Sequence, residues 1–379
     1  MVRNASAPSM VKPEGDARAE IDLAADPLLA ARAAGLHYTP AGKPGITRRR
    51  AGRGWSFRGP DGGVIHDPVI RQRLDDLAIP PAWTDVWINP DPRGHIQATG
   101  RDARGRKQYL YHPRWRDVRD ATKFDRMVAF GEALPSLRQR VERDLGLPGL
   151  PREKTIATVV RLLDRSLIRI GNAEYARDNG SYGLTTLRDD HVEVEGSTVR
   201  FAFRGKSGKV HEVDLRDRRI ARILRAMQDL PGQPLFQYLD EQRDPQTIDS
   251  DDVNAYLRQI AGEAFTAKDF RTWSGTVLAA RALREIGAGA TKSAIMANLV
   301  TAIDAVAAAL RNTRAVCRSS YIHPLVLAGY ESGDLLTFTC DGATTTGLDP
   351  DEQWTLAYLR AAGGRRSEQR VESRESTVS

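Results

Sequence analysis

The sequence predicts an α+β fold with two domains, a small sheet-rich one followed by a mostly helical one. Short segments punctuated by glycine and proline fill the chain from about 38 to 111. Apolar residues then recur every three to four positions, as in amphipathic helices. One island of alternating apolar residues interrupts that pattern, which predicts a small sheet inserted into the second domain. A length of 379 residues also favours two domains.

The first domain is predicted to span 29–113, after a disordered tail over 1–28 that is rich in Ala, Asp, Glu and Pro. Its turns are marked by runs such as 59–63, which reads Gly-Pro-Asp-Gly-Gly. Trp55, Phe57 and Trp87 lie between such turns and predict strands. His112 and Pro113 are predicted to open a linker to the second domain.

The second domain is predicted to span 114–350 and to be mostly helical. Helical spacing marks two segments, 156–170 and 295–310, and alternation marks three strands around 192–194, 199–203 and 213–215. Residues 204–209 read as the turn between the second and third strands. The remaining chain, 351–379, ends in Arg, Glu and Ser and is predicted to be a disordered tail.

The charge of the chain is unevenly distributed. Its net charge is +7, but 43–58 holds six basic residues and no acidic one, and 93–126 holds ten basic against four acidic residues. The rest of the chain is therefore net negative. A localised positive field of this kind favours a surface that binds a polyanion such as nucleic acid.

Composition also narrows the location and the cofactor classes. Only two cysteines occur, Cys317 and Cys340, which argues against a disulfide framework or a thiolate zinc site and suits a reducing compartment. The most apolar stretch, 294–310, is broken by Asn298 and Asp304, so we expect no membrane span. No apolar signal core begins the chain, and the expected location is the cytoplasm, associated with the nucleoid.

Two motifs resemble nucleotide-binding loops without meeting their requirements. Gly205-Lys206-Ser207 would need a glycine at position 200, which is Arg200 in a predicted strand. Gly287-Ala288-Gly289 lacks the third glycine and follows a helical pattern. The acidic and histidine residues also form no recognisable metal-binding motif. We therefore expect no nucleotide, no metal and no other cofactor.

The remaining candidates for chemistry are cations and a tyrosine. They are Arg169, Lys206 in the predicted turn, Arg271 within Phe270-Arg271-Thr272-Trp273, Asn312, and Tyr321 at the end of Cys317-Arg318-Ser319-Ser320-Tyr321. Arg169 is predicted to lie near the end of a helix. Each is weak alone, since an arginine at a helix end usually partners the helix dipole and a tyrosine usually packs.

Their joint occurrence is more specific. The runs 116–126 and 179–188, Phe270-Arg271-Thr272-Trp273, and 317–321 follow one another in an order and spacing that resembles the type IB DNA topoisomerases, in particular their small poxvirus-like bacterial branch. The resemblance covers roughly 30–345. It implies a fold like that of the DNA breaking-rejoining enzymes.

The resemblance also implies a reaction. The family cuts one strand of duplex DNA through a 3′-phosphotyrosyl intermediate, allows rotation and religates, without ATP or metal. Matched to its motifs, Tyr321 is the nucleophile, Arg169 and Arg271 bind the scissile phosphate, and Lys206 protonates the 5′-oxygen. Asn312 stands where many relatives have histidine. The protein is expected to act as a monomer.

These roles are chemically coherent. Two guanidinium groups can bind the phosphate oxygens in pairs and stabilise the charge that develops in an in-line attack. A phenol has a pKa of about 10, so nearby arginines would favour its reactive anion. A lysine on a mobile turn can deliver a proton to the leaving group. Asn312 carries no charge, so its contribution should vary little with pH, unlike that of a histidine.

The first domain is expected to hold DNA through Gly105-Arg106-Lys107-Gln108-Tyr109-Leu110-Tyr111. Alternation places Tyr109 and Tyr111 on one face of a strand and Gln108 on the other, with Arg106 and Lys107 leading in. By resemblance, Gln108, Tyr109 and Tyr111 touch DNA, although one tyrosine could instead be a core residue.

Two other functions remain open at this stage. A tyrosine recombinase or integrase uses a similar set of residues, but usually has His-x-x-Arg at the second arginine, where this chain reads Lys268-Asp269-Phe270-Arg271. A non-catalytic basic nucleic-acid-binding protein would not need Tyr321.

Overall fold

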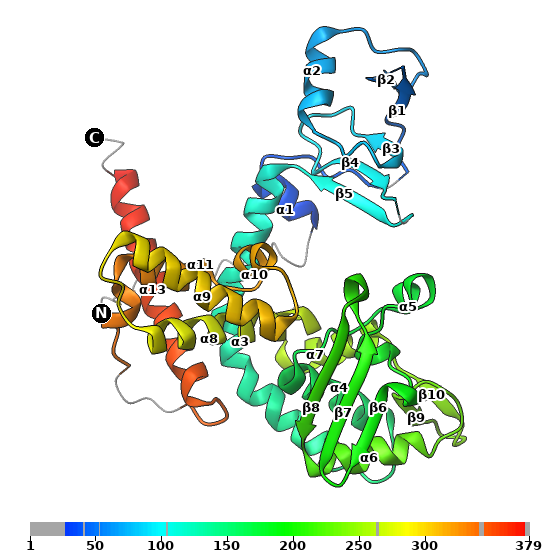
Figure 1. Cartoon of the computed structure of the whole chain (residues 1–379), viewed down its shortest axis with the longest axis vertical. Coiled ribbons are helices and arrows are strands. Elements are labelled where there is room, and N and C mark those ends of the chain that lie inside the picture. The colour runs from blue at the N-terminus through cyan, green and yellow to red at the C-terminus, as the bar shows by residue number, and fades with distance from the viewer. Residues whose placement is uncertain are drawn as a thin grey trace, which may run out of the picture. The chain divides into compact units, whose positions relative to one another are not determined.

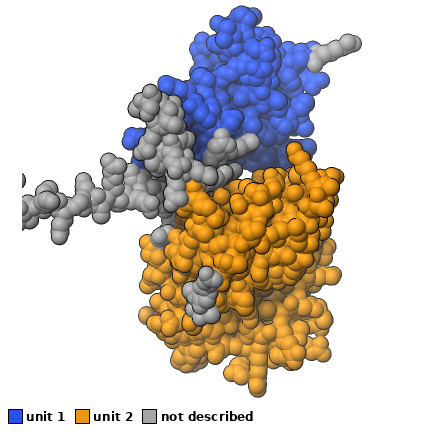
Figure 2. All heavy atoms as spheres, turned by 90° about the vertical axis from the view of Figure 1, so that its left-hand side faces the viewer, with its two compact units in different colours: residues 1–122 blue, residues 123–379 orange. Residues whose placement is uncertain are grey.

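The computed structural model describes residues 27–40, 42–52, 54–103, 105–262, 265–340 and 345–375. Almost all of the predicted N-terminal tail, 1–28, lies outside these residues. The chain divides into two compact units, 1–122 and 123–379 (Figure 2). The predicted α+β class is confirmed, because the first unit is built on a sheet and the second is helical with small sheets.

The first unit contains a five-stranded antiparallel sheet in the order β2-β1-β3-β4-β5 (Figure 1). Its strands are β1 (Ile46–Ala51), β2 (Gly54–Arg58), β3 (Thr84–Ile88), β4 (Ile96–Arg101) and β5 (Lys107–Tyr111). Two helices accompany them, α1 (Pro27–Ala33) and α2 (Pro68–Asp76). Asp67 caps α2 by accepting hydrogen bonds from the backbone of Val69 and Ile70. Leu74 of α2 joins Phe57 and Ile88 in the core of this unit.

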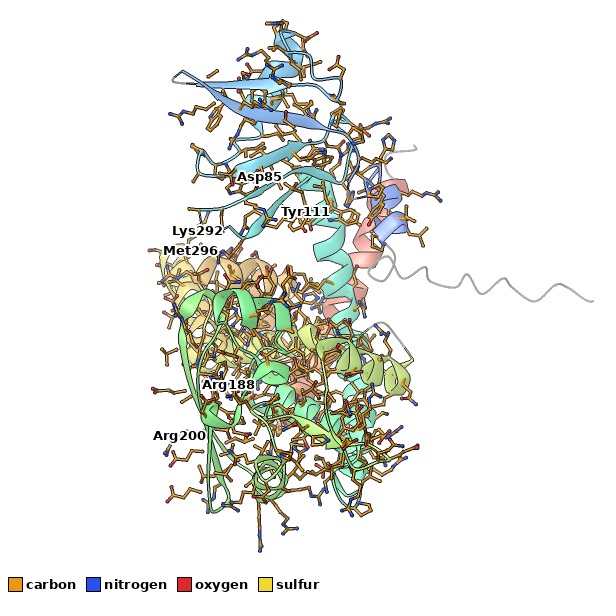
Figure 3. All side chains as sticks on the ribbon, turned by 90° about the vertical axis from the view of Figure 1, so that its right-hand side faces the viewer. Asp85, Tyr111, Arg188, Arg200, Lys292 and Met296 are labelled. Atoms are coloured by element: carbon orange, nitrogen blue, oxygen red, sulfur yellow. The ribbon has the colours of Figure 1, made fainter. Side chains whose placement is uncertain are left out.

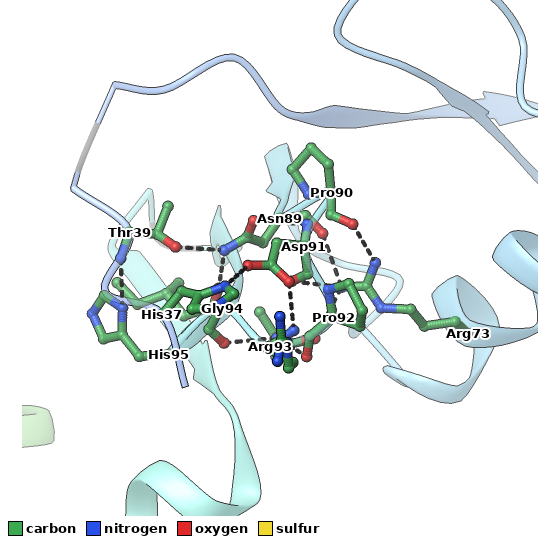
Figure 4. A network of polar contacts seen from close by, with 12 residues as sticks. His37, Thr39, Arg73, Asn89, Pro90, Asp91, Pro92, Arg93, Gly94 and His95 are labelled. Carbon is green, nitrogen blue, oxygen red and sulfur yellow. Dashed lines mark hydrogen bonds and ion pairs between the residues drawn. The ribbon is translucent and has the colours of Figure 1, made fainter. Parts of the chain in front are cut away.

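A polar network holds the segment before β1 against the loop between β3 and β4 (Figure 4). His37 Nδ1 lies 2.5 Å from Asp91 Oδ2, and the backbone N–H of Thr39 donates to His95 Nδ1 at 3.0 Å. Asn89 Nδ2 donates to Thr39 Oγ1 at 2.8 Å. The polar groups of this part of the unit therefore serve the fold.

The second unit begins within a long helix. Pro113 is the first residue of α3 (Pro113–Leu145), so the prediction of a linker at His112 and Pro113 is wrong. Proline suits this place because the first turn of a helix does not use its backbone N–H groups. The predicted boundary after 113 falls nine residues before the division between the units after 122.

The three predicted strands of the second unit are confirmed. They are β6 (Val192–Glu195), β7 (Thr198–Arg204) and β8 (Val210–Arg216), an antiparallel sheet in that order. A short 3₁₀ turn, Lys206–Gly208, joins β7 to β8. Val199, Phe201 and Phe203 face the core, whereas Arg200 is on the exposed face and pairs with Glu193 and Asp214 (Figure 3). A second small sheet pairs β9 (Gln237–Leu239) with β10 (Pro245–Thr247).

The remaining elements of this unit are mostly helices. They are α4 (Arg152–Ser166), α5 (Ala173–Asn179), α6 (Arg218–Gln228), α7 (Ser250–Ala261), α8 (Ala267–Ile286), α9 (Lys292–Leu310), α10 (Arg314–Ser320), α11 (Pro324–Ser332), α12 (Asp334–Thr337) and α13 (Pro350–Glu375). Of these helices, α4 and α6 contact the sheets. In Figure 1, α8 and α9 lie side by side. Among the described residues, α9 alone is long and apolar enough to cross a membrane by length and composition, and its Leu299, Ile303 and Val306 are buried in the core.

Two sequence predictions are wrong in this unit. The helix predicted over 156–170 ends at Ser166, because Leu167 adopts a left-handed conformation, so Arg169 lies in the extended segment that follows. The tail predicted over 351–379 is helical as far as Glu375. Leu356, Tyr358 and Leu359 of α13 are buried, since apolar residues at helical spacing precede the polar end of the chain.

Candidate active site

Helix α8 brings Arg271 next to Tyr321. Arg271 is only 3% exposed, and its guanidinium carbon lies 5.3 Å from the centre of the Tyr321 ring. One turn further along α8, a Cβ on Gly275 would lie 2.5 Å from the carbonyl oxygen of Tyr321, so only glycine permits this approach. Thr276 Oγ1 also accepts from the backbone N–H of His323 at 3.1 Å. A single rigid helix thus fixes both groups.

The guanidinium of Arg271 contacts backbone carbonyls and no carboxylate among the described residues. Arg271 Nη2 donates to the carbonyl of Leu310 at 2.7 Å, and Nη1 donates to that of Leu167. Its Nε is buried and has no hydrogen-bond partner in the described part of the chain. Burial, and then the charge of Arg169, lower the pKa of Arg271 to about 10.

Arg169 reaches the same place from the segment that follows α4. The backbone N–H of Leu184 donates to the carbonyl of Arg169 at 2.9 Å. A Cβ on Gly183 would lie 2.6 Å from that same carbonyl oxygen, which explains a glycine in the 179–188 motif. Arg169 Nη2 donates to Asn312 Oδ1 at 2.6 Å. The amide Nδ2 of Asn312 is buried and unpaired among described residues.

Tyr321 lies at the end of α10, half-buried beside these cations. Burial alone would raise the pKa of its phenol, but the charges of Arg271 and Arg169 outweigh it, and the pKa is lower than that of a free tyrosine. Lys268 contributes in the same direction. The phenol is therefore shifted toward the form that can act as a nucleophile.

Lys206 lies apart from this cluster, at the tip of the β7–β8 turn. Its side chain is exposed and makes no hydrogen bond or ion pair with another described residue. The base of the turn is nevertheless fixed near the arginines, because the backbone N–H of Tyr182 donates to the carbonyl of Arg204 at 2.8 Å. The structure thus brings together Arg169, Arg271, Asn312 and Tyr321 and leaves Lys206 on a neighbouring turn.

Sequence reasoning missed two residues of this site. Lys123 belongs to the 116–126 run and was not predicted to be a site residue. Its Nζ lies 5.6 Å from the centre of the Tyr321 ring and donates to the carbonyl of Ser320. His211 lies under the turn that carries Lys206 and is 4% exposed. A lone histidine in a strand gave no signal that could have identified it.

No cluster of three or more His, Cys, Asp or Glu suited to a metal ion occurs within the described ranges. The convergent groups of the site are cations and amides, which bind anions rather than metal ions. The arrangement can therefore bind a phosphate beside a nucleophilic phenol.

The residues predicted to bind DNA in the first unit lie along β5. The rings of Tyr109 and Tyr111 stack with centres 6.0 Å apart, so the prediction that they share a face is confirmed (Figure 3 labels Tyr111). Tyr109 is 44% exposed. Arg106 Nε and Gln108 Nε2 both donate to Asp102 Oδ2, at 2.8 and 2.9 Å. Lys107 Nζ lies 5.4 Å from the centre of the Tyr109 ring.

Family models match both parts of the chain. Residues 112–332, more than half of the chain, match the model described as "Eukaryotic DNA topoisomerase I, catalytic core". Residues 54–102 match "Bacterial DNA topoisomerase IB, N-terminal domain".

Individual relatives agree with these models. The chain is 32% identical over 268 residues to DNA topoisomerase 1B of Acanthamoeba polyphaga mimivirus, covering 69% of this chain and 80% of that one. It is 24% identical over 187 residues to DNA topoisomerase 1B of vaccinia virus (strain Copenhagen), covering 48% and 60%. It is 26% identical over 176 residues to DNA topoisomerase 1 of Mycosarcoma maydis, covering 42% and 17%.

Proposed function

The chain belongs to the type IB DNA topoisomerases, and we propose that it relaxes supercoiled duplex DNA with Tyr321, Arg169, Arg271, Lys206 and Asn312 as its catalytic residues. The observation that carries the assignment of residues is the convergence of Arg169, Arg271 and Asn312 around Tyr321 from separate segments. Family membership establishes the enzyme class, and the assignment of individual residues is our proposal.

Tyr321 acts as the nucleophile. Its phenolic oxygen attacks the scissile phosphorus, the new P–O bond to Tyr321 forms, and the bond from phosphorus to the 5′-oxygen breaks. The lowered pKa of Tyr321 supports this role, because it reduces the cost of forming the phenolate. The strand is left with a 3′-phosphotyrosyl end and a free 5′-hydroxyl. Rotation about the intact strand then releases supercoils.

Arg169 and Arg271 bind the non-bridging oxygens of that phosphate. No described carboxylate pairs with either side chain, so their charge is available to an anion. The buried unpaired atoms, Arg271 Nε and Asn312 Nδ2, gain a partner when phosphate oxygens arrive. Because the developing charge meets donors that are already in place, the transition state is stabilised more than the ground state.

Lys206 is the general acid for the 5′-oxygen. Its exposed place on the turn leaves the ammonium group free to reach a leaving group on bound DNA. Religation is the reverse: the 5′-hydroxyl returns its proton to Lys206 and displaces Tyr321. Since the phosphotyrosyl ester keeps the energy of the broken bond, religation needs no ATP.

The first unit holds the duplex through Arg106, Lys107, Gln108, Tyr109 and Tyr111. The exposed ring of Tyr109 and the cation of Lys107 beside it support this role, because phosphates and sugars are contacted by such side chains. We further propose that the protein works as a monomer in the cytoplasm, on nucleoid DNA, without a membrane or nucleotide partner.

The test is relaxation of a negatively supercoiled plasmid in EDTA without ATP. The parent protein is expected to relax the plasmid completely and to leave a protein–DNA adduct that survives denaturant. Tyr321→Phe is expected to bind DNA and do neither. Relaxation by Tyr321→Phe at the parent rate would overturn the proposal, and reciprocal exchange of both strands between two duplexes without relaxation of the plasmid would instead indicate recombinase chemistry.

A further inference from the structure

His211 is a buried titratable residue for which the mechanism above has no role. It belongs to β8, is 4% exposed, and its Nε2 is buried with no hydrogen-bond partner among described residues. A buried polar atom without a hydrogen-bond partner is energetically unfavourable, so an apolar side chain would be less costly here. The position of the ring offers a reason for its presence.

The imidazole ring packs directly under the residue that precedes Lys206. A Cβ on Gly205 would lie 2.5 Å from His211 Cδ2 and 2.6 Å from Nε2, so the ring occupies the space of any side chain there. The ring is stacked on Phe203, its cross-strand partner, with centres 5.0 Å apart and an interplanar angle of 14°. The ring of His211 therefore packs against both Phe203 of β7 and Gly205 of the turn.

The turn above the ring is closed by its own backbone. The N–H of Gly205 donates to the carbonyl of Lys209 at 2.8 Å, and the N–H of Gly208 donates to that of Gly205 at 3.0 Å. These two bonds tie Gly205 to the far side of the turn, and the ring of His211 lies directly against Gly205.

The strand on both sides of His211 is tied to the arginine cluster. Arg311 Nη1 donates to the carbonyl of Val210 at 3.1 Å, and Nη2 donates to that of Glu212. Arg311 directly precedes Asn312, which accepts from Arg169. Burial and the surrounding cations Arg311, Arg169, Arg271 and Lys209 lower the pKa of His211 to about 4, so the ring is neutral at physiological pH.

We propose that His211 is a positioning residue that seats the Lys206 turn on the Arg169–Arg271 cluster through its contact with Gly205. The flat, neutral ring sets the height of the turn and hence the direction from which the Lys206 ammonium group approaches the 5′-oxygen. A bulkier contact raises the turn and an absent ring lets it sink. This inference rests on the proposed role of Lys206 as the general acid.

The experiment compares two oligonucleotide substrates in single-turnover cleavage. One has the normal 5′-oxygen at the scissile bond, and the other has a bridging 5′-sulfur, whose thiolate leaves with little protonation. A residue that acts through Lys206 should slow cleavage of the oxygen substrate and spare the sulfur substrate. A residue that merely supports the fold should slow both equally.

Gly205→Ala and His211→Ala are each expected to slow the oxygen substrate by about tenfold or more and the sulfur substrate by less than about threefold. The double variant Gly205→Ala/His211→Ala should cleave the oxygen substrate faster than Gly205→Ala alone, because removing the ring makes room for the new methyl group. Equal slowing of both substrates by Gly205→Ala and His211→Ala would overturn the proposal, as would a double variant that cleaves the oxygen substrate no faster than Gly205→Ala alone.

Two controls separate this inference from its premise. Val199→Ala removes a buried side chain of the same sheet away from the turn, and its oxygen-to-sulfur rate ratio should equal that of the parent. Lys206→Ala should show the largest rescue by sulfur. If Lys206→Ala is slowed equally on both substrates, the general-acid role is wrong and this inference falls with it. If Lys206→Ala is rescued and the Gly205 and His211 variants are not, only this inference is wrong.

Discussion

Two arginines of the second unit, Arg138 and Arg271, have opposite electrostatic environments. Arg138 on α3 donates to Asp164 and to Glu352 with two hydrogen bonds each, at 2.7–2.9 Å. Burial alone would lower the pKa of Arg138, but Glu352 and Asp164 raise it above the ordinary value. Arg271 on α8 has carbonyls and a second arginine around it, and its pKa falls to about 10.

The difference separates a structural arginine from one prepared for a ligand. Arg138 has its charge matched and all its contacts lie within the protein, so it stabilises the packing of α3, α4 and α13. Arg271 lies beside Arg169 without a described anion, an arrangement that costs free energy in the unliganded protein. That cost is recovered when an anionic group binds between the two guanidinium groups.

Removal of the ligand-binding arginine is expected to have the largest effect, which is on the rate of DNA cleavage. Arg271→Ala is expected to slow DNA cleavage by about a hundredfold or more, because one of the two guanidinium groups is lost from the transition state. The measurement is the single-turnover cleavage rate, with the melting temperature as a check on folding. A loss below about threefold in a folded variant would remove Arg271 from the proposed active site.

Arg138→Met should reverse the pattern. It leaves the buried carboxylates of Asp164 and Glu352 without a cation, and the free energy of unfolding should fall by about 3–5 kcal/mol. The cleavage rate per folded molecule, measured well below the melting temperature, should stay within about threefold of the parent. If this variant were as stable as the parent but catalytically impaired, the division into structural and ligand-binding arginines would be wrong.

Low pH is expected to reduce the stability of the folded protein through His211, which lies near Arg169 and Arg271. Its pKa of about 4 in the folded protein is below its ordinary value of 6.5. As the pH falls from 6.5 toward 4, the unfolded chain takes up a proton at this residue and the folded protein does not, so the histidine's contribution to stability is lost over that range. Melting curves should show a smaller stability difference between parent and His211→Gln at pH 4.5 than at pH 7. Parallel curves would contradict the burial of a neutral ring.

The smallest effect is expected in the first unit, where the basic stretch 43–58 is predicted from the sequence to bind DNA. Arg48 donates to the carbonyls of Ile79, Pro80 and Trp83 at 2.8, 2.9 and 3.0 Å and lies 4.0 Å from the centre of the Trp55 ring, whereas Arg49 is exposed. Arg49→Ala should therefore reduce the slope of log affinity against log salt by about 0.9, as expected for one phosphate contact. Arg48→Ala should leave that slope unchanged and lower the melting temperature. A slope for Arg49→Ala equal to that of the parent would mean that Arg49 contacts no phosphate.

Local patterns made most of the fold predictable. Alternation found β6, β7 and β8, and helical spacing found α4 and α9, because burying one face imposes a period on the sequence. The end of α4 was missed because Leu167, a left-handed residue without the usual glycine, gives no stop signal. Helix α13 was missed because most of the segment 351–379 is polar. Its apolar residues Leu356 and Leu359 pack on partners that are distant in sequence.

The candidate site was predictable only as a set of residues. Motif order identified Arg169, Arg271, Asn312 and Tyr321, and the structure brings their side chains together. The sequence could not indicate that Arg48 is held by backbone carbonyls, or that His211 lies under Gly205, because both depend on segments that meet only in the folded unit. Counting charges located basic stretches but could not separate structural arginines from available ones.

The proposed nucleophile can be identified by locating the amino acid that becomes linked to DNA. A substrate whose leaving strand is too short to remain paired after cleavage would trap the intermediate, and mass spectrometry of the digested adduct would locate the modified residue. We expect a 3′-nucleotide joined through phosphate to Tyr321. A nucleotide on any other residue, such as the half-buried Tyr182 or the exposed Tyr175, would contradict it.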